Sequence, residues 1–319
     1  MIINKVIKSI LESKKIGISF HASPDGDSIG SSLGLMQGLM KLNKEVYILC
    51  DDKVPEVYGY LPCIKSIINA SSTIKDGTDC IIILDCGSYD RISVNLSEFP
   101  KNYYLINVDH HITNELYGDI NFVNTRASAV GEIVYNILKE LKVKIDENIS
   151  LCLYTSIVTD TGGFKYSNTT TETHNIIGEL IKTGINFSEV HRLIFENKKY
   201  ERVKLYGSVI NSMYLTHKDK ICVMKLTSDL LNDFSNKASD TSDIISIGME
   251  IDTVEVAILL KEMSEGVKIS LRSKSIVDVR KIAEAFGGGG HTRASGLSID
   301  KNITEVEKII LNAVENELV

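Results

Sequence analysis

Four apolar runs between residues 16 and 108 constrain the fold of this chain most strongly. They cover residues 16–20, 46–50, 80–84 and 104–108, and stretches with helical spacing separate them. Near-continuous apolar runs that alternate with helices are typical of a parallel sheet that is buried on both faces. The predicted fold class is therefore α/β, with an N-terminal parallel sheet flanked by helices.

Acidic and histidine residues lie at the ends of these runs. His21 follows the first run, Asp85 the third and Asp109 the fourth, and further acids and histidines lie close by in Asp25, Asp27, His110 and His111. Asp160 lies farther along the chain, at the C-terminal end of a helix predicted at 149–158. The carboxyl ends of parallel strands meet at one edge of a sheet, so these side chains are expected to converge there. Crowded carboxylates repel one another unless cations separate them. Two divalent metals meet that requirement, and such pairs serve phosphoester hydrolysis.

Each of these groups also has a purely structural interpretation. Asp27 or Ser28 could cap the helix predicted at 28–42, although this leaves His21 and Asp25 unexplained. Glycines after Asp160 could simply end the helix predicted at 149–158. The adjacent histidines are harder to explain as core residues, because a buried imidazole needs a partner. One ring could bind metal while the next faces substrate, with Asp109 orienting a ring.

The second half of the chain predicts a smaller α/β domain with a mixed sheet. A strand is expected at 221–226, a hairpin at 253–260 and 267–271 that turns at Glu265-Gly266, and helices at 277–286 and 304–317. A charged helical stretch at 188–216 lacks the composition of a flexible linker. The predicted domains are 1–187 and 217–319, joined by this connector, with the active site between them.

Composition excludes several classes of protein. A net charge of −7 argues against a broad surface for long duplex DNA. Six cysteines without a CxxC pair are expected to be buried free thiols in a reducing cytoplasm, and Tyr103 and Tyr104 are expected in the core. No apolar stretch is long enough to span a bilayer, so no membrane association is predicted and the expected location is cytoplasmic. Small residues such as Gly30 and Gly34 are expected to pack a helix closely onto the sheet.

Taken in order, the motifs HxxxDxD, LDCG, DHH and TDTGG resemble those of the DHH phosphoesterase superfamily. The segment Gly287–Gly296, which reads GGGGHTRASG, resembles the DHH-associated C-terminal domain. Among subfamilies, the chain is most similar to the nanoRNase/pAp-phosphatase group. That resemblance implies hydrolysis of very short oligonucleotides to mononucleotides, and of 3′-phosphoadenosine 5′-phosphate (pAp) to AMP and phosphate.

The resemblance also implies roles for individual residues. Two metals, usually Mn²⁺, would be bound. The first would be held by His21, Asp25 and Asp85. The second would be held by Asp27, Asp85, His110 and Asp160, so that Asp85 bridges the two. His111 would contact the scissile phosphate, and Asp109 would orient a histidine ring without contacting the phosphate itself. Substrate would be bound by Arg272, Ser273, Gly288, Gly289, Gly290, His291 and Arg293.

Some alternatives stay open at this point. The glycine run permits close approach of backbone N–H groups to an anion, but it is also consistent with a flexible turn. Arg272 suits a bidentate phosphate contact or a solvated strand end, and Arg126 could be a phosphate ligand or a surface charge. Other candidate functions are a phosphodiesterase of cyclic dinucleotides or their linear products such as pApA, an inorganic pyrophosphatase and an inactive nucleotide-binding regulator. A homodimer is one option for the assembly.

Overall fold

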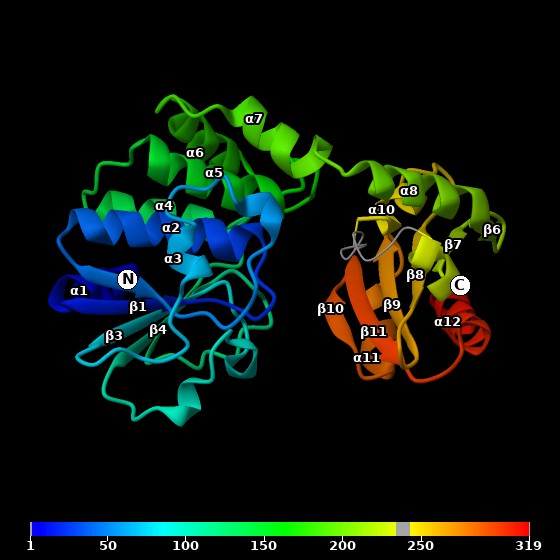
Figure 1. Ribbon diagram of the computed structural model, residues 1–319, viewed down its shortest axis with the longest axis horizontal. Coiled ribbons are helices and arrows are strands. Elements are labelled where there is room, and N and C mark those ends of the chain that lie inside the picture. The colour runs from blue at the N-terminus through cyan, green and yellow to red at the C-terminus, as the bar shows by residue number, and fades with distance from the viewer. Residues whose placement is uncertain (1, 234–242, 319) are drawn as a thin grey trace. The chain divides into compact units, whose positions relative to one another are not determined.

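The computed structural model describes residues 2–233 and 243–318, and the chain forms two compact units (Figure 1). The first unit is Met1–Asn197 and the second is Lys198–Val319. The predicted connector at 188–216 is largely helical, and the structure divides it between the two units. Its last helix, α8 (Tyr200–Ser212), buries Leu205 and Val209 in a core cluster of the second unit.

The first unit is built on a five-stranded parallel sheet, which confirms the predicted fold class. The strand order is β2-β1-β3-β4-β5, and every neighbouring pair is parallel. The strands are β1 (Lys15–Ser19), β2 (Glu45–Ile48), β3 (Cys80–Leu84), β4 (Tyr104–Asp109) and β5 (Ile120–Val123). Their carboxyl ends therefore meet at one edge, as parallel pairing requires.

Both faces of this sheet are buried. Alternate residues of β3 enter different clusters: Ile82 lies in the larger cluster with the helices, and Ile81 lies in a smaller one on the other face. The second face is covered by a segment with two short 3₁₀ turns, η2 (Tyr89–Arg91) and η3 (Leu96–Glu98). Burial on both faces explains why the strands appear in the sequence as continuous apolar runs.

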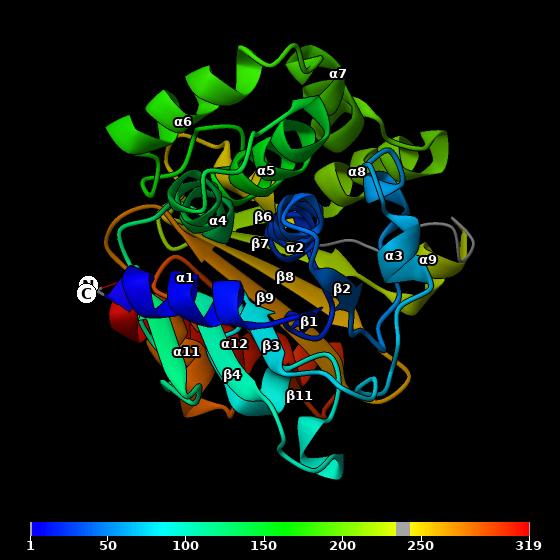
Figure 2. The same ribbon diagram turned by 90° about the vertical axis from the view of Figure 1, so that its left-hand side faces the viewer.

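Helices of the first unit pack on one another as well as on the sheet (Figure 2). They are α1 (Ile2–Glu12), α2 (Gly26–Lys41), α3 (Lys65–Ile68), α4 (Val130–Glu140), α5 (Glu147–Asp160), α6 (Thr171–Ile181) and α7 (Phe187–His191), with a 3₁₀ turn η1 (Glu56–Tyr58) and a π-helical turn η4 (Arg192–Glu196). Gly30 and Gly34 of α2 face α5, not the sheet as expected. A Cβ on Gly30 would lie 2.5 Å from the backbone oxygen of Cys152, so this crossing requires glycine.

The second unit contains a six-stranded mixed sheet in the order β10-β11-β9-β8-β7-β6. Its strands are β6 (Tyr214–Thr216), β7 (Ile221–Leu226), β8 (Val256–Glu262), β9 (Val267–Ser273), β10 (Gly289–His291) and β11 (Ala294–Ile299). Helices α9 (Ser228–Asp233), α10 (Ile245–Met249), α11 (Val279–Ala285) and α12 (Ile303–Glu317) accompany them. The predicted hairpin is confirmed, since β8 and β9 pair antiparallel and Gly266 turns between them with φ +68°.

Some expectations about burial and local structure are wrong. Tyr104 is 64% exposed, because it is the first residue of β4 and lies outside the core, whereas Tyr103 is partly buried. Cys63 is exposed, while the other five cysteines are buried, and all six are free thiols. Strands β5, β6, β10 and β11 were not predicted, since their short or polar sequences lack a clear apolar run.

Candidate metal centre

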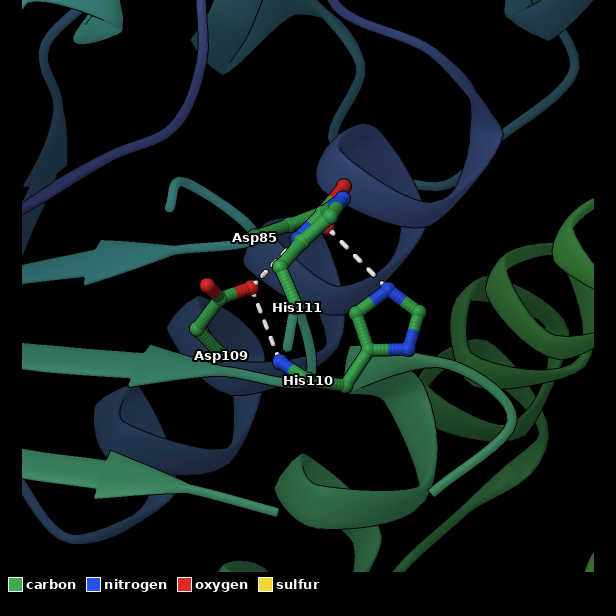
Figure 3. Close-up of side chains that lie close together, drawn as sticks. All are labelled: Asp85, Asp109, His110 and His111. Atoms are coloured by element: carbon green, nitrogen blue, oxygen red, sulfur yellow. Dashed lines mark hydrogen bonds and ion pairs between the residues drawn. The ribbon is translucent and has the colours of Figure 1, made fainter. Parts of the chain in front are cut away.

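Neighbouring strands β3 and β4 bring Asp85 and the Asp109–His111 segment together at the carboxyl edge of the sheet (Figure 3). Asp109 is fully buried, and its Oδ1 accepts hydrogen bonds from the backbone N–H of His110 (2.8 Å) and from Nδ1 of His111 (2.7 Å). Oδ1 of Asp85 lies 3.6 Å from Nε2 of His110 and 3.7 Å from Nδ1 of His111. Two carboxylates and two imidazoles thus share one small region.

His21 joins this region from the end of the adjacent strand β1. Its Nε2 lies 3.4 Å from Oδ2 of Asp85 and 3.7 Å from Oδ1 of Asp25. The other ring nitrogen, Nδ1, is 2.9 Å from the carbonyl oxygen of Ala22. A carbonyl can only accept, so Nδ1 carries the hydrogen and Nε2 faces the carboxylates.

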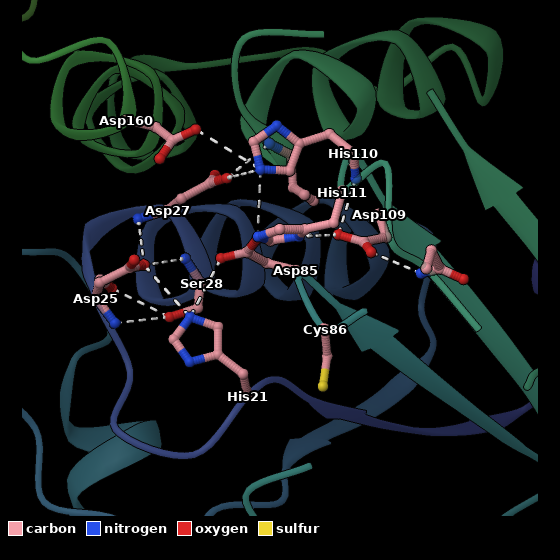
Figure 4. Close-up of polar contacts among 12 residues, drawn as sticks. His21, Asp25, Asp27, Ser28, Asp85, Cys86, Asp109, His110, His111 and Asp160 are labelled. Atoms are coloured by element: carbon pink, nitrogen blue, oxygen red, sulfur yellow. Dashed lines mark hydrogen bonds and ion pairs between the residues drawn. The ribbon is translucent and has the colours of Figure 1, made fainter. Parts of the chain in front are cut away.

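His110 faces a second set of acids in the same way that His21 faces Asp25 and Asp85 (Figure 4). Its Nε2 lies 3.6 Å from Oδ2 of Asp160 and 3.9 Å from Oδ2 of Asp27. Nδ1 of His110 donates to the carbonyl of Ala127 at 3.2 Å, which again leaves Nε2 on the acidic side. Backbone carbonyls therefore orient both rings with Nε2 toward the carboxylates, as is usual for histidines that bind metals.

The loop after β1 corrects one structural alternative. Asp25, and neither Asp27 nor Ser28, caps α2: its Oδ1 accepts from the backbone N–H of Asp27 (3.0 Å) and of Ser28 (3.1 Å). The helix begins at Gly26, two residues before the apolar pattern suggests, which moves the cap back to Asp25. Asp25 thus has a structural role in addition to its place beside His21.

Asp27 lies on the first turn of α2 and is only 1% exposed. Its Oδ2 accepts from the backbone N–H of Val130 at 2.7 Å, and its Oδ1 accepts from Gly131 N–H (3.2 Å) and from the hydroxyl of Ser156 (2.5 Å). These N–H groups belong to the first turn of α4, which lacks a capping side chain of its own. Asp27 therefore ties α2, α4 and α5 together beside His110.

Asp160 is the last residue of α5, and the glycines after it end the helix. The N–H of Gly162 bonds to the carbonyl of Thr159 and that of Gly163 to the carbonyl of Val158, which is the Schellman pattern. Gly162 has φ +56°. The structural interpretation of these glycines is correct, and it leaves the Asp160 carboxylate directed at His110.

Burial and mutual repulsion shape the electrostatics of the site. Burial, followed by the charge of Asp27, raises the pKa of Asp85 well above its usual range, and the same two causes raise the pKa of Asp160. Burial opposes the charge on His21, but the hydrogen bonds and charges of Asp25 and Asp85 raise its pKa to about 11. Without a metal, the cluster thus retains protons that a cation would displace.

The donor set fits divalent cations. Among the described residues, three groups place their ligand atoms within 4.8 Å of one another: His21 with Asp25 and Asp85; Asp27 with His110 and Asp160; and Asp85 with Asp109, His110 and His111. Asp85 and His110 each belong to two groups, so the groups are contiguous. Imidazole nitrogens combined with carboxylate oxygens suit Mn²⁺, Zn²⁺ or Mg²⁺ more than soft metals.

Comparison with known proteins agrees with this geometry. The family model described as "DHH family, N-terminal domain" matches residues 15–157, and the DHHA1 domain model matches residues 218–319. The bifunctional oligoribonuclease and PAP phosphatase NrnA of Thermus thermophilus is 30% identical over 99% of this chain and 94% of its own length. The chain belongs to the DHH family.

Solved structures share this fold. An exopolyphosphatase-related protein from Bacteroides fragilis has a TM-score of 0.92 and 28% identity, covering 99% of this chain and 96% of that chain. RecJ from Thermus thermophilus, solved in complex with Mn²⁺, has a TM-score of 0.55 and 13% identity, covering 99% of this chain and 53% of its own. Among the described residues of this DHH-family member, no helix is both long and apolar enough to cross a membrane.

Backbone hydrogen bonds and close packing explain much of the glycine run in the DHHA1 region. Gly287 follows α11 with φ +77°, and its N–H and that of Gly288 bond to the carbonyls of Glu284 and Ala283, another Schellman end. A Cβ on Gly288 would lie 2.3 Å from the backbone oxygen of Gly296. Around Gly289, by contrast, an added Cβ would meet nothing within 4 Å. Its place is in β10, whose residues are all exposed.

The arginines of the DHHA1 region differ in their surroundings. The guanidinium of Arg293 donates to the carbonyls of Val277 (2.9 Å) and Ser275, so it holds the loop after β9. The hydroxyl of Ser273 donates to the carbonyl of Val277 at 2.6 Å. Arg272 is partly buried in β9 and donates to the carbonyl of Leu271 at 3.0 Å. Roles for these residues in substrate binding, and for the exposed His291, stay predictions.

Several residues that support the site were not found from the sequence. Ser156 lies one helical turn before Asp160, a spacing that could have identified it. Asn168 donates to the carbonyls of Ser128 and Asp160, and nothing in its local sequence indicates this. The hydroxyl of Ser128 is bonded to Glu132 at 2.5 Å. Arg126 is exposed, which leaves both of its interpretations open.

Proposed function

We propose that this chain hydrolyses very short oligonucleotides to mononucleotides and pAp to AMP and phosphate. The observation that carries the proposal is the contiguous set of carboxylates and imidazoles centred on Asp85 and His110. It is supported by the near-full-length similarity to a protein named as both an oligoribonuclease and a PAP phosphatase. Both reactions break a phosphoester bond of a small nucleotide, so a single site can serve them.

The proposed metal ligands are those implied by the family resemblance. His21, Asp25 and Asp85 would hold one divalent cation, and Asp27, Asp85, His110 and Asp160 a second. When bound, such a pair lowers the pKa of water and neutralises charge on phosphoryl oxygens. Mn²⁺ is the favoured metal, because the ligands combine imidazole with carboxylate and because the RecJ neighbour was solved with Mn²⁺.

His111 is proposed to contact the scissile phosphate. Its Nδ1 donates to Asp109, so the imidazole ring is fixed and its Nε2 is the nitrogen that would meet the substrate. Nε2 would then face the negative charge that develops on the phosphoryl group. His111 would then donate a hydrogen bond, or a proton, to an oxygen of that group.

Residues of the second unit are proposed to bind the substrate. Arg272 would pair with a phosphate, since a planar guanidinium matches phosphate geometry. Exposed Gly289 would let a backbone N–H approach an anion closely, as an unobstructed glycine can. Ser273, Gly288, Gly290, His291 and Arg293 complete the proposed set, in part by holding this segment in shape.

A panel of substrates tests the proposal. The full chain, stripped with EDTA and reloaded with Mn²⁺, is assayed on pAp, pApA, cyclic di-AMP, pyrophosphate and RNAs of two to 24 nucleotides. We expect AMP from pAp, mononucleotides from the shortest RNAs, and a steep fall in rate with length. Faster hydrolysis of pyrophosphate or cyclic di-AMP than of pAp and dinucleotides would overturn the substrate assignment. Metal binding without any turnover would instead support an inactive regulator.

The remaining expectations are also proposals. Linear products of cyclic dinucleotides such as pApA are dinucleotides, so they fall within the proposed substrate range. A cytoplasmic location and a homodimer stay predictions. Light scattering of the purified chain over a range of concentrations measures the assembly directly.

A further inference from the structure

Two hydrogen-bonded amides, one buried and one partly buried, form a chain that leads to Asp109. Asn107, in the middle of β4, is fully buried, and Asn114 follows the histidines. Nδ2 of Asn114 donates to Oδ2 of Asp109 at 2.6 Å and to Oδ1 of Asn107 at 2.7 Å. Nδ2 of Asn107 donates to the carbonyl of Cys86 at 3.1 Å and to the hydroxyl of Tyr117 at 3.0 Å.

Backbone groups fix the direction of this chain at both ends. The backbone N–H of Leu116 donates to Oδ1 of Asn114 at 2.8 Å, so the amide must present its NH₂ group to Asp109 and Asn107. At the other end, the carbonyl of Cys86 can only accept, and it also receives the hydroxyl of Tyr117 at 2.8 Å. Neither amide can be flipped without placing two donors or two acceptors face to face.

Asp109 therefore receives donors on both oxygens. Asn114 donates to Oδ2, while the backbone of His110 and the ring of His111 approach Oδ1. A carboxylate held by donors on two sides cannot rotate, and its Oδ1 stays in place as the acceptor for His111. A hydrogen-bond network in which every hydrogen has an acceptor is rigid, and removing one member leaves the others unsatisfied.

We propose that Asn114 is a positioning residue: with Asn107 and Tyr117 it locks Asp109, and Asp109 in turn holds His111 with its Nδ1–H inward and Nε2 toward the substrate. The proposal rests on the proposed function only for the contact of His111 with phosphate. The supply of a fixed tautomer is a property of the protein by itself. It can be measured whatever the substrate proves to be.

The test compares two substitutions at one position. Asn114→Ala removes the donor, and we expect kcat to fall about 10- to 100-fold with KM changed less than threefold. Asn114→Asp keeps the size and the acceptor for Leu116, but it turns a second carboxylate oxygen toward Asp109. We expect Asn114→Asp to lose more activity than Asn114→Ala. A role limited to filling space predicts the opposite order, since the isosteric residue would then be tolerated best.

A matched control comes from Asn121 in β5, the strand that follows this loop. Asn121 accepts from the N–H of Gly118 and donates to the carbonyls of Leu116 and Gly118, so these hydrogen bonds hold the turn and do not involve Asp109. Asn121→Ala should weaken the loop and leave kcat within about threefold of wild type. If Asn121→Ala lowers kcat as much as Asn114→Ala, loop stability explains the effect and the proposal is wrong.

Nitrogen-15 spectra of the His111 ring give a readout that does not depend on turnover. Spectra are recorded at pH 8.5 on the full chain with Mg²⁺, and the resonance is assigned by its loss in His111→Asn. We expect the Nδ1–H form in wild type and Asn121→Ala, and a mixture of both tautomers in Asn114→Ala. An unchanged tautomer in Asn114→Ala overturns the positioning role. Wild-type protein with the expected tautomer but no phosphoesterase activity would count against the proposed function alone.

Discussion

The metal centre of the first unit and the glycine-arginine segment of the second unit differ in what their characteristic residues do for the fold. At the metal centre, Asp85 and Asp160 have raised pKa values because burial and neighbouring carboxylates oppose their charge. Such crowding does not stabilise a fold, so a ligand has to explain it. In the second unit, Gly287, Gly288 and Arg293 each have a structural partner. In that unit, the presence of the motif does not by itself show whether its residues bind substrate or only stabilise the fold.

The largest effect is expected at the centre of the acidic set. Asp85 has φ +53°, a conformation that asparagine tolerates better than alanine, so Asp85→Asn is the cleaner variant. We expect it to lower turnover at least about 1,000-fold, because both proposed cations lose a shared ligand. Turnover with saturating Mn²⁺ and metal content by mass spectrometry measure the effect.

Asp146 provides the contrasting acid. It caps α5 by accepting from the N–H of Ile149 and pairs with Lys41 at 2.5 Å. Asp146→Asn should leave turnover within about twofold and cost at most about 1 kcal/mol of stability. If Asp85→Asn retained wild-type turnover with added Mn²⁺, the contrast between the two regions would disappear, since the buried acids would then be structural as well.

The glycine run offers the next test. Gly288→Ala would force a Cβ against the backbone of Gly296, and we expect a loss of about 1–3 kcal/mol in the free energy of unfolding. Gly289→Ala has open space, so stability should change by less than about 0.5 kcal/mol while KM rises several-fold. Chemical denaturation and steady-state kinetics of both variants separate the two roles. An unchanged KM in Gly289→Ala would make the run purely structural.

Sequence alone predicted the parts of the molecule that a local pattern determines. Strands β1, β3 and β4 lie within one residue of their apolar runs, because burial on both faces gives an unmistakable composition. β5 was missed since Ile-Asn-Phe-Val is half-buried and mixes polar with apolar residues. β10 was missed because Gly-Gly-His has no strand propensity, and only pairing with β11 makes it a strand.

The candidate site divides in the same way. The residue types at the strand ends were visible in the sequence, since each follows an apolar run. The partners that orient them were not, because the carbonyl of Ala127 contacts His110 across 17 residues and Asp27 reaches Val130 across 103. Identifying Asp25 as the helix cap, in place of the expected Asp27 or Ser28, also needed the backbone, because all three residues lie near the start of α2.

Proton linkage distinguishes the metal centre from the rest of the protein. The pKa of His21 rises from 6.5 to about 11 in the folded chain because of Asp25 and Asp85, despite the opposing effect of burial. A raised folded pKa stabilises the protein fully below pH 6.5, and that stability is lost progressively between pH 6.5 and about 11. His21 by itself should therefore cost the metal-free chain roughly 1–2 kcal/mol of stability between pH 6.5 and 8.

Mn²⁺ should reverse this dependence, because cations bind the deprotonated ligands and bind them better as the pH rises. Thermal unfolding in EDTA and in Mn²⁺ at several pH values measures both slopes. His21→Asn should flatten the slope in EDTA. If His21→Asn and wild type showed the same slope in EDTA, the ring would not retain its proton in the metal-free fold.

The smallest effects are expected for the arginines of the second unit, and they decide whether its motif binds substrate at all. Arg272→Ala should raise KM about tenfold and change kcat less than threefold, because a phosphate contact made in the ground state is lost. Arg293→Ala should instead lower stability by about 1–2 kcal/mol, since two carbonyls of the loop after β9 lose their donor. Kinetics on a dinucleotide, together with chemical denaturation, show whether each arginine acts in substrate binding or in stability. Equal changes in KM for the two variants would mean that Arg293 acts on the substrate through the loop that it holds, and the second unit would then resemble the metal centre more than its backbone contacts suggest.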